Sequence, residues 1–274
     1  MLIRFDMEKL QRDKGSAART AAPSSVTNFD ADAPVEDIPG YRRVICVVPA
    51  RNAVAAMLED DMHCLAVTLR HEGGVVRSAE TMIERLPWDT CPGAAAKLEA
   101  TFAGHPLAEV TARREKKQNC THMHDMAVLA AAHAHDASEL RYDLYASDPV
   151  EGTRILEVRR NAAPIHRWIE RDGILIGPEA VAGRTLLTLR DWIASLKGVE
   201  QEAARLLQWA ALVAHGRTIP LAEQSRAADL PPNCYTFQPE RAAHAQRVGD
   251  RLDFSDGSHV PLAAIDDKVR ATLR

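Results

Sequence analysis

The sequence predicts an α+β fold, in which an antiparallel sheet has helices packed on one face. Segments rich in β-branched residues come in groups, and each group is followed by two segments with helical character. Grouped strands beside grouped helices favour this class over the strict strand–helix alternation of a parallel sheet. Because the pattern of strands and then two helices occurs twice, the sequence also predicts two related units.

Changes in composition divide the chain into three segments. Residues 1–40 are rich in turn residues and lack sustained periodicity, so we expect an extended N-terminal arm that lies on the body or on a partner subunit. The first α+β unit is expected at 41–137. The second unit, with a C-terminal extension, is expected at 138–274.

In the first unit, β-branched residues indicate the strands, Pro49 is expected to end the first of them, and Gly73-Gly74 predicts a hairpin turn. Gly104 is a common residue just after a helix C-terminus, and apolar residues recur at helical spacing further on. The strands are expected at 42–48, 63–69 and 75–86, and the helices at about 93–103 and 120–135.

The second unit follows the same order of elements. Its strands are expected at 140–147, 153–160, 165–170 and 173–176, and its helices at 188–196 and 199–215. After Pro231-Pro232 we expect a short helix and a hairpin around Asp256-Gly257.

Composition excludes several classes of function. The chain has 274 residues, 26% charged and 46% apolar, as in soluble globular proteins. A net charge of −4 argues against a nucleic-acid partner, and no apolar run approaches the ~20 residues needed to cross a bilayer. Five cysteines without a close CxxC pair suit a reducing cytoplasm. Because GxGxxG, GxxxxGK[ST], HExxH and GxSxG motifs are missing, the familiar nucleotide, zincin and serine-hydrolase functions lose support.

The first polar cluster lies at 59–64, ahead of an expected strand. Because side chains alternate along a strand, Asp61 and His63 are expected on one face. A carboxylate beside an imidazole orients the ring and raises its basicity, which suits a general base. An acidic turn with an inert His63 explains the same residues equally well.

The second cluster, at 85–92, joins an expected strand to a helix, where backbone N–H groups are free to bind a ligand. Arg85 and Trp88 are candidate substrate contacts, although Trp88 could equally fill the core. Cys91 lies just ahead of the helix, where the dipole lowers a thiol pKa. Since free cysteines are often buried as small hydrophobes, a structural role is favoured for Cys91.

The third cluster lies at the start of the helix expected at 120–135. His122 and Asp125 are three residues apart and therefore neighbours on one helix face, an arrangement suited to acid/base catalysis. A capped helix with exposed histidines is the alternative, and it is the one that we expect for His124, His133 and His135. Outside the clusters, Tyr142 is a weaker candidate for contact with a substrate phenol, and Tyr235 for substrate binding.

These clusters carry a resemblance to a known family. Asp60-Asp61-Met62-His63, the segment 85–94 and Asn119-Cys120-Thr121-His122 resemble segments of an uncharacterised bacterial family, classed as a domain of unknown function. The resemblance covers roughly residues 1–190. Members often occur beside genes for breaking down aromatic compounds or steroids. One branch is similar to phenylcoumaran γ-formaldehyde lyases, which convert lignin dimers to stilbenes.

The same segments are similar in order to iron–sulfur scaffold proteins of the nitrogen-fixation type. That resemblance implies that the three clusters converge in space, with Cys91 and Cys120 in the positions of two scaffold cysteines. The scaffold's first motif has a glycine-flanked cysteine, whereas this chain reads Asp60-Asp61-Met62-His63-Cys64. The departure weakens a cluster-assembly role and leaves the fold similarity intact.

Together, these observations and the family resemblance favour a carbon–carbon lyase that needs no cofactor and releases formaldehyde from a lignin-derived phenolic dimer. Its expected partner is a small aromatic substrate, and self-association into a homo-oligomer is compatible with this function. The catalytic candidates are His63, Asp61, His122, Asp125 and Tyr142, and the substrate-binding candidates are Arg85, Trp88, Cys91, Cys120 and Tyr235. Two alternatives stay open: a zinc or iron enzyme using His63, Cys91, Cys120 and His122, and a non-catalytic scaffold.

Overall fold

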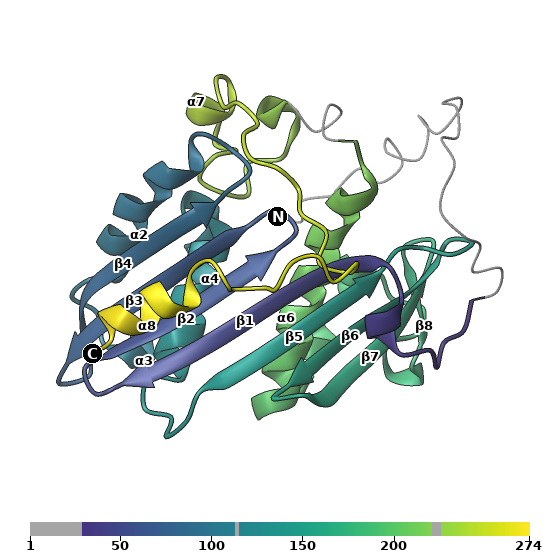
Figure 1. Cartoon of the computed structure of the whole chain (residues 1–274), viewed down its shortest axis with the longest axis horizontal. Coiled ribbons are helices and arrows are strands. Elements are labelled where there is room, and N and C mark those ends of the chain that lie inside the picture. The colour runs from purple at the N-terminus through teal and green to yellow at the C-terminus, as the bar shows by residue number, and fades with distance from the viewer. Residues whose placement is uncertain (1–28, 113–114, 221–225) are drawn as a thin grey trace.

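The computed structural model describes residues 29–112, 115–220 and 226–274. Its centre is one eight-stranded sheet in the order β4-β3-β2-β1-β5-β6-β7-β8, with every neighbouring pair antiparallel (Figure 1). The strands are β1 (Gly40–Ala50), β2 (Ala53–Asp60), β3 (Cys64–Glu72), β4 (Val75–Arg85), β5 (Leu140–Ser147), β6 (Thr153–Arg160), β7 (Ala163–Arg171) and β8 (Ile174–Gly177).

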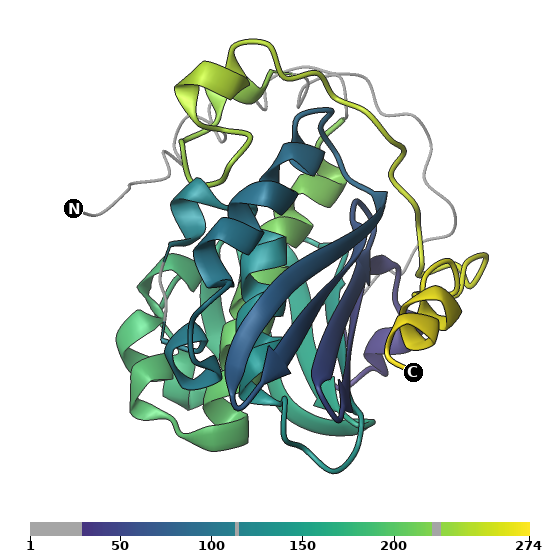
Figure 2. The same ribbon diagram turned by 90° about the vertical axis from the view of Figure 1, so that its left-hand side faces the viewer.

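Helices α2, α4 and α6 cover one face of this sheet, and the arrangement confirms the predicted α+β class. The helices are α2 (Ala94–Phe102), α3 (Leu107–Val110), α4 (Thr121–Ala132), α5 (Arg190–Ser195), α6 (Gly198–Ala214), α7 (Pro239–Ala242) and α8 (Asp266–Thr272). Helices α2 and α4 lie over the β1–β4 half and α6 over the β5–β8 half (Figure 2). Within the described ranges, no helix has both the length and the apolar composition needed to span a bilayer.

The two halves of the chain share the sheet. Each half is a four-stranded meander followed by helices, and the halves meet where β1 pairs with β5. The chain passes from one half to the other between α4 and β5. The main core lies between the sheet and the helices, where Ile45, Leu58 and Leu98 are fully buried.

Three elements differ from the expectations. Strand β2 was not predicted, because it is buried on both faces and rich in alanine, so it shows no alternation. Pro49 does not end β1 but pairs with Val54 beside the hairpin turn. No strand forms around Asp256-Gly257, and helix α8 instead packs on the sheet face opposite the other helices, with Ile265 and Val269 against β1–β3 (Figures 1 and 2).

The chain around and after α7 runs across the end of the sheet where β2 turns into β3. Residues 234–255, called the C-terminal strap below, hydrogen-bond through their backbone to the start of α4, the 86–92 loop and the β2–β3 turn. The bonds run from Tyr235 N to Asn119 O (2.9 Å), Val248 N to Pro87 O (3.0 Å) and Leu252 N to Asp61 O (2.8 Å). The predicted arm lies mostly outside the described residues; from residue 29 onward, it contains a short 3-10 helix, Val35–Asp37.

Candidate functional site

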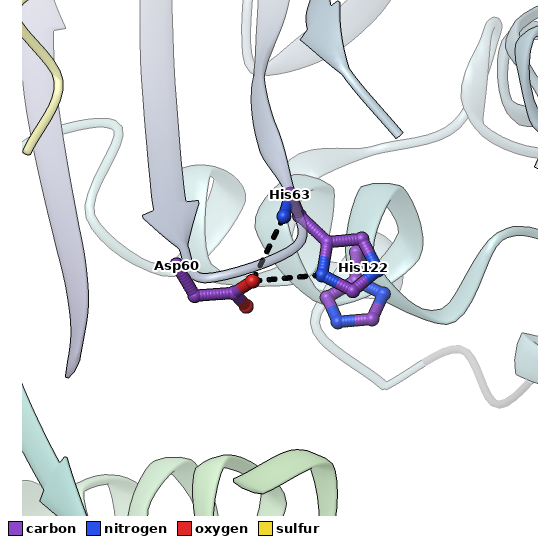
Figure 3. Close-up of side chains that lie close together, drawn as sticks. All are labelled: Asp60, His63 and His122. Carbon is purple, nitrogen blue, oxygen red and sulfur yellow. Dashed lines mark hydrogen bonds and ion pairs between the residues drawn. The ribbon is translucent and has the colours of Figure 1, made fainter. Parts of the chain in front are cut away.

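The site begins with a three-residue turn between β2 and β3. Asp60 ends β2, and its Oδ1 accepts hydrogen bonds from the backbone N–H groups of Met62 and His63, both at 2.9 Å. This side chain therefore caps the turn, a common use of aspartate. The same Oδ1 lies 2.9 Å from Nδ1 of the His63 ring (Figure 3).

The second oxygen of Asp60 holds two residues of β1. Oδ2 accepts hydrogen bonds from the Tyr41 hydroxyl at 2.7 Å and from Nε and Nη2 of Arg43 at 3.0 Å and 2.7 Å. Burial alone would raise the pKa of Asp60, but the adjacent His63 and Arg43 hold it well below its usual range. Asp60 is therefore a buried carboxylate, neutralised by the buried guanidinium of Arg43.

Two imidazole rings from distant segments stack at this carboxylate. The centroids of His63 and His122 are 3.7 Å apart with an angle of 26° between the ring planes (Figure 3). Trp209, from α6, lies 4.9 Å from the His122 ring and 4.2 Å from the centre of the Arg43 guanidinium. His63 and His122 are each less than a tenth exposed, so the pair is nearly dry.

The neighbours place the hydrogen on Nδ1 of both imidazoles, but they occupy different nitrogen atoms of the two rings. Since the Asp60 carboxylate only accepts, Nδ1 of His63 must carry a hydrogen, so that in the neutral ring the lone pair is on Nε2. Nη2 of Arg43 lies 3.2 Å from Nε2 of His122 and can only donate, so the hydrogen of His122 is on Nδ1. Burial, and then the nearby His63 and Arg43, lower the pKa of His122 well below its usual range. The pair therefore presents one acceptor and one neutral donor.

The predicted partner of His63 is wrong. Strand alternation would put Asp61 beside His63, but Asp61 lies in the turn, where alternation does not apply. Its Oδ2 instead pairs with Nη1 of Arg217 at 2.7 Å, and Arg217 also binds Asp148 and Asp253. Burial raises the pKa of Asp61 to about 7 in spite of this ion pair. Asp61 ties the turn to the C-terminal strap.

The predicted partner of His122 is also wrong. Asp125 forms an ion pair with Lys116, and its Oδ1 lies 3.5 Å from Nδ1 of His124. These contacts join Asp125 to Lys116 and His124, and none of its ion pairs is with His122. His124, expected to be exposed, is buried beside Phe102.

Tyr142 belongs to a different polar cluster. Its hydroxyl donates to Oε1 of Glu202 at 2.6 Å, and Glu202 also lies 3.0 Å from Nε2 of His133, whose Nδ1 is 2.7 Å from Asp136. His133 follows His122 by eleven residues, or about 16 Å along α4. Tyr142 is therefore not a contact of the stacked imidazoles.

This second cluster predicts a pH dependence of stability. Burial opposes protonation of His133, but the hydrogen bonds and charges of Glu202 and Asp136 raise its pKa. A raised pKa adds stability that is fully present below the unfolded value of about 6.5 and is lost as the pH rises through the folded value. Between about pH 6 and pH 9, urea unfolding should show a loss of about 1–3 kcal/mol. The same series on His133→Gln should lack this loss, and an equal loss in both proteins would contradict the assignment.

The substrate-binding candidates gather around the 86–92 loop and the C-terminal strap. Arg85 pairs with Glu59 at 2.8 Å and donates to the backbone carbonyls of Asp60 and Asp61, so it braces the β2–β3 turn. Trp88 is buried, with its ring 5.9 Å from Phe237 in an edge-on contact. Both residues hold the frame of the site, and substrate contact by them stays a prediction.

The thiols lie in the same region and are not poised as nucleophiles. Sγ of Cys91 is 3.3 Å from Oγ1 of Thr236, and Cys120 is the N-cap of α4. Burial raises the pKa of Cys91, contrary to the expected dipole effect, and raises that of Cys120 to about 12. Tyr235 lies under the Arg241 guanidinium at 3.9 Å, inside the strap.

One group of described residues has the donor set and spacing for a metal ion. Single ligand atoms of Asp60, His63 and His122 all lie within 4.8 Å of one another, and all three residues are buried. The ligand set is therefore two imidazoles and a carboxylate, without the predicted thiols of Cys91 and Cys120. Two depressions of about 320 Å³ and 290 Å³ are lined by other residues, such as Arg190 and His135.

Sequence reasoning missed three residues of this site. Asp60, Arg43 and Trp209 are not among the predicted site residues, although Asp60 lies in the first polar cluster. An arginine inside the apolar strand segment 42–48 was a usable signal, because a buried guanidinium requires an acidic partner. No family model matches the chain, and no curated protein matches it either, so the resemblances described above stay predictions.

Proposed function

We propose that this protein is an acid/base enzyme, a carbon–carbon lyase that releases formaldehyde from a phenolic dimer. The observation that carries the acid/base part is the stacked pair His63–His122, in which Asp60 occupies the N–H of His63 and Arg43 occupies the lone pair of His122. Pairs of titratable groups whose environments differ in this way are typical of acid and base assignments. The substrate class comes from the family resemblance.

The roles follow from the free nitrogen atoms. Nε2 of His63 is the general base, because Asp60 fixes the ring through Nδ1. The N–H at Nδ1 of His122 is a hydrogen-bond donor to a developing oxyanion, because Arg43 keeps Nε2 as an acceptor. Asp61, Asp125 and Tyr142 have no part in this proposal.

The proposed reaction uses the general base of His63 and the N–H donor of His122. Ionisation of the para-phenol expels the ring ether oxygen as a phenoxide and forms a quinone methide, and His122 stabilises the departing oxygen. His63 then takes the hydroxymethyl proton, the carbon–carbon bond breaks, and formaldehyde leaves. The bond electrons form the stilbene double bond and restore the arene as its phenolate. The proton on His63 passes to the departed phenoxide, and the para-phenolate regains from water the proton that it lost to water at the start. A positioned proton transfer of this kind contributes about 10²–10⁴-fold to the rate.

Access to the imidazoles requires a segment to move, since both are nearly buried. The C-terminal strap is the candidate, because it crosses the β2–β3 turn and is held there by few backbone bonds, among them Leu252 N to Asp61 O. The test of the function is incubation of the protein with a panel of phenolic dimers, followed by assay of formaldehyde and stilbene in equal amounts. Absence of formaldehyde with every phenylcoumaran would contradict the lyase.

A metal enzyme is the second candidate, and the close approach of ligand atoms from Asp60, His63 and His122 favours it. Against it, both Asp60 oxygens already accept hydrogen bonds, and a guanidinium faces Nε2 of His122. We therefore expect a chelator to leave formaldehyde release unchanged. The check is activity before and after chelation, with metal content measured. Loss of activity that zinc or iron restores would favour the metal enzyme, and a bound iron–sulfur cluster without turnover would favour a scaffold.

A further inference from the structure

The Arg43 guanidinium has a donor that the protein does not use. Its side chain is fully buried, and Nε and Nη2 bind the Asp60 carboxylate. Nη1 is buried as well, but it has no hydrogen-bond partner among the described residues. A buried N–H without an acceptor is unfavourable, and native proteins rarely leave one. Nη1 is therefore a buried hydrogen-bond donor without an acceptor among the described residues.

The planar fork of the guanidinium sets where that acceptor lies. Nη2 has two hydrogens, and it contacts both Asp60 and Nε2 of His122. Nε also contacts Asp60, so the Nη2 hydrogen that points to Asp60 is the one on the same side as Nε. The other Nη2 hydrogen, which points to His122, is therefore on the same side as Nη1. In a planar guanidinium, one hydrogen of Nη1 runs parallel to this second Nη2 hydrogen. The unused N–H of Nη1 therefore points to the side of the guanidinium on which the stacked imidazoles lie.

The surroundings favour an aromatic anion over other acceptors. The flat face of Trp209 packs on the guanidinium at 4.2 Å, and the His122 ring lies 4.9 Å from the same indole. Arginine stays charged at every relevant pH, so it favours an ionised oxygen over a neutral hydroxyl.

We propose that Nη1 of Arg43 binds the phenolate oxygen of the substrate, and so holds the phenol in its ionised form. This inference rests on the proposed function, because it assigns the group that stabilises the first ionisation in that reaction. It makes Arg43 a substrate-binding residue as well as the partner of Asp60.

A nitrophenol tests the subsite without turnover, because its phenolate absorbs at longer wavelength than the neutral phenol. Added to the full chain below its own pKa, 4-nitrophenol should bind with the phenolate spectrum. 4-Nitroanisole, which cannot ionise, should not compete. Arg43→Lys keeps a positive charge but loses the fork, and it should weaken nitrophenolate binding at least about tenfold.

Arg154→Lys is the matched control, because Arg154 is also buried, pairs with Glu170 at 2.9 Å and contacts a histidine, His215, at 3.0 Å. It should bind nitrophenolate like the parent protein. Binding of the neutral phenol, no binding at all, or equal binding by Arg43→Lys would overturn the proposal. Formaldehyde release without phenolate binding would reject only the subsite, whereas phenolate binding without release on any dimer would reject only the lyase.

Discussion

Replacing His63 with asparagine is expected to lower turnover about 10²–10⁴-fold, the usual contribution of a positioned general base. The amide nitrogen of asparagine takes the place of Nδ1 and can still donate to Asp60, so the turn keeps its cap. What the variant lacks is Nε2, the only nitrogen of His63 that the carboxylate leaves free. The substitution therefore separates the catalytic nitrogen from the structural one.

The measurement is formaldehyde release at saturating substrate, with urea unfolding as a check on the fold. His71→Asn is the control, because His71 is also buried and lies on β3, the strand that follows His63, at the end away from the turn. We expect His71→Asn to keep the turnover of the parent protein. Parent-like turnover in His63→Asn would show that this imidazole is not the base.

The sequence predicted the fold correctly in segments whose apolar residues follow a single strand or helix periodicity. Strands β5 and β6 lie where they were expected, and Gly73 and Gly74 form the β3–β4 turn with positive φ angles of 58° and 77°. Prediction failed for β2, where burial on both faces removes the alternation. It failed again for α8, which covers the outer face of a sheet expected to have helices on one face only.

For the site, the sequence identified the correct imidazoles but not their partners. His63 and His122 do meet, although 59 residues separate them and no local rule brings them together. The error at Asp61 came from applying strand alternation to a turn, in which Asp60 reaches forward to cap the backbone of His63. Whether a carboxylate belongs to a strand or to a turn depends on a boundary of one residue, which composition does not define.

The remaining site residues come from tertiary packing. Trp209 reaches His122 because α6 lies on the same face of the sheet as α4, and nothing near residue 209 indicates this. Arg43 could have been suspected, since its neighbours Val44 and Ile45 mark a buried strand. Its partner could not have been chosen among the acidic residues, because the β1–β2 register decides it: Arg43 lies opposite Asp60.

Replacing Asp60 with asparagine is expected to lower the free energy of unfolding by about 3–5 kcal/mol, because it leaves a buried guanidinium without its counter-charge. Three donors reach Oδ1, namely the two backbone N–H groups of the turn and Nδ1 of His63. Three more reach Oδ2, from Tyr41 and Arg43. The amide of asparagine would place an NH2 group at one of the two oxygen positions, where three donors require an acceptor.

Urea unfolding of Asp60→Asn beside Asp143→Asn measures this effect. Asp143 pairs with Arg141 at 2.7 Å, but Arg141 is about half exposed, so its loss should change stability by no more than about 1 kcal/mol. Because the folded pKa of Asp60 is depressed, its contribution is present above the unfolded value of about 4 and fades as the pH falls through the folded value. The gap between Asp60→Asn and the parent protein should therefore narrow in strong acid. A gap no larger than that of Asp143→Asn at neutral pH would mean that the Arg43–Asp60 pair does not hold the site together.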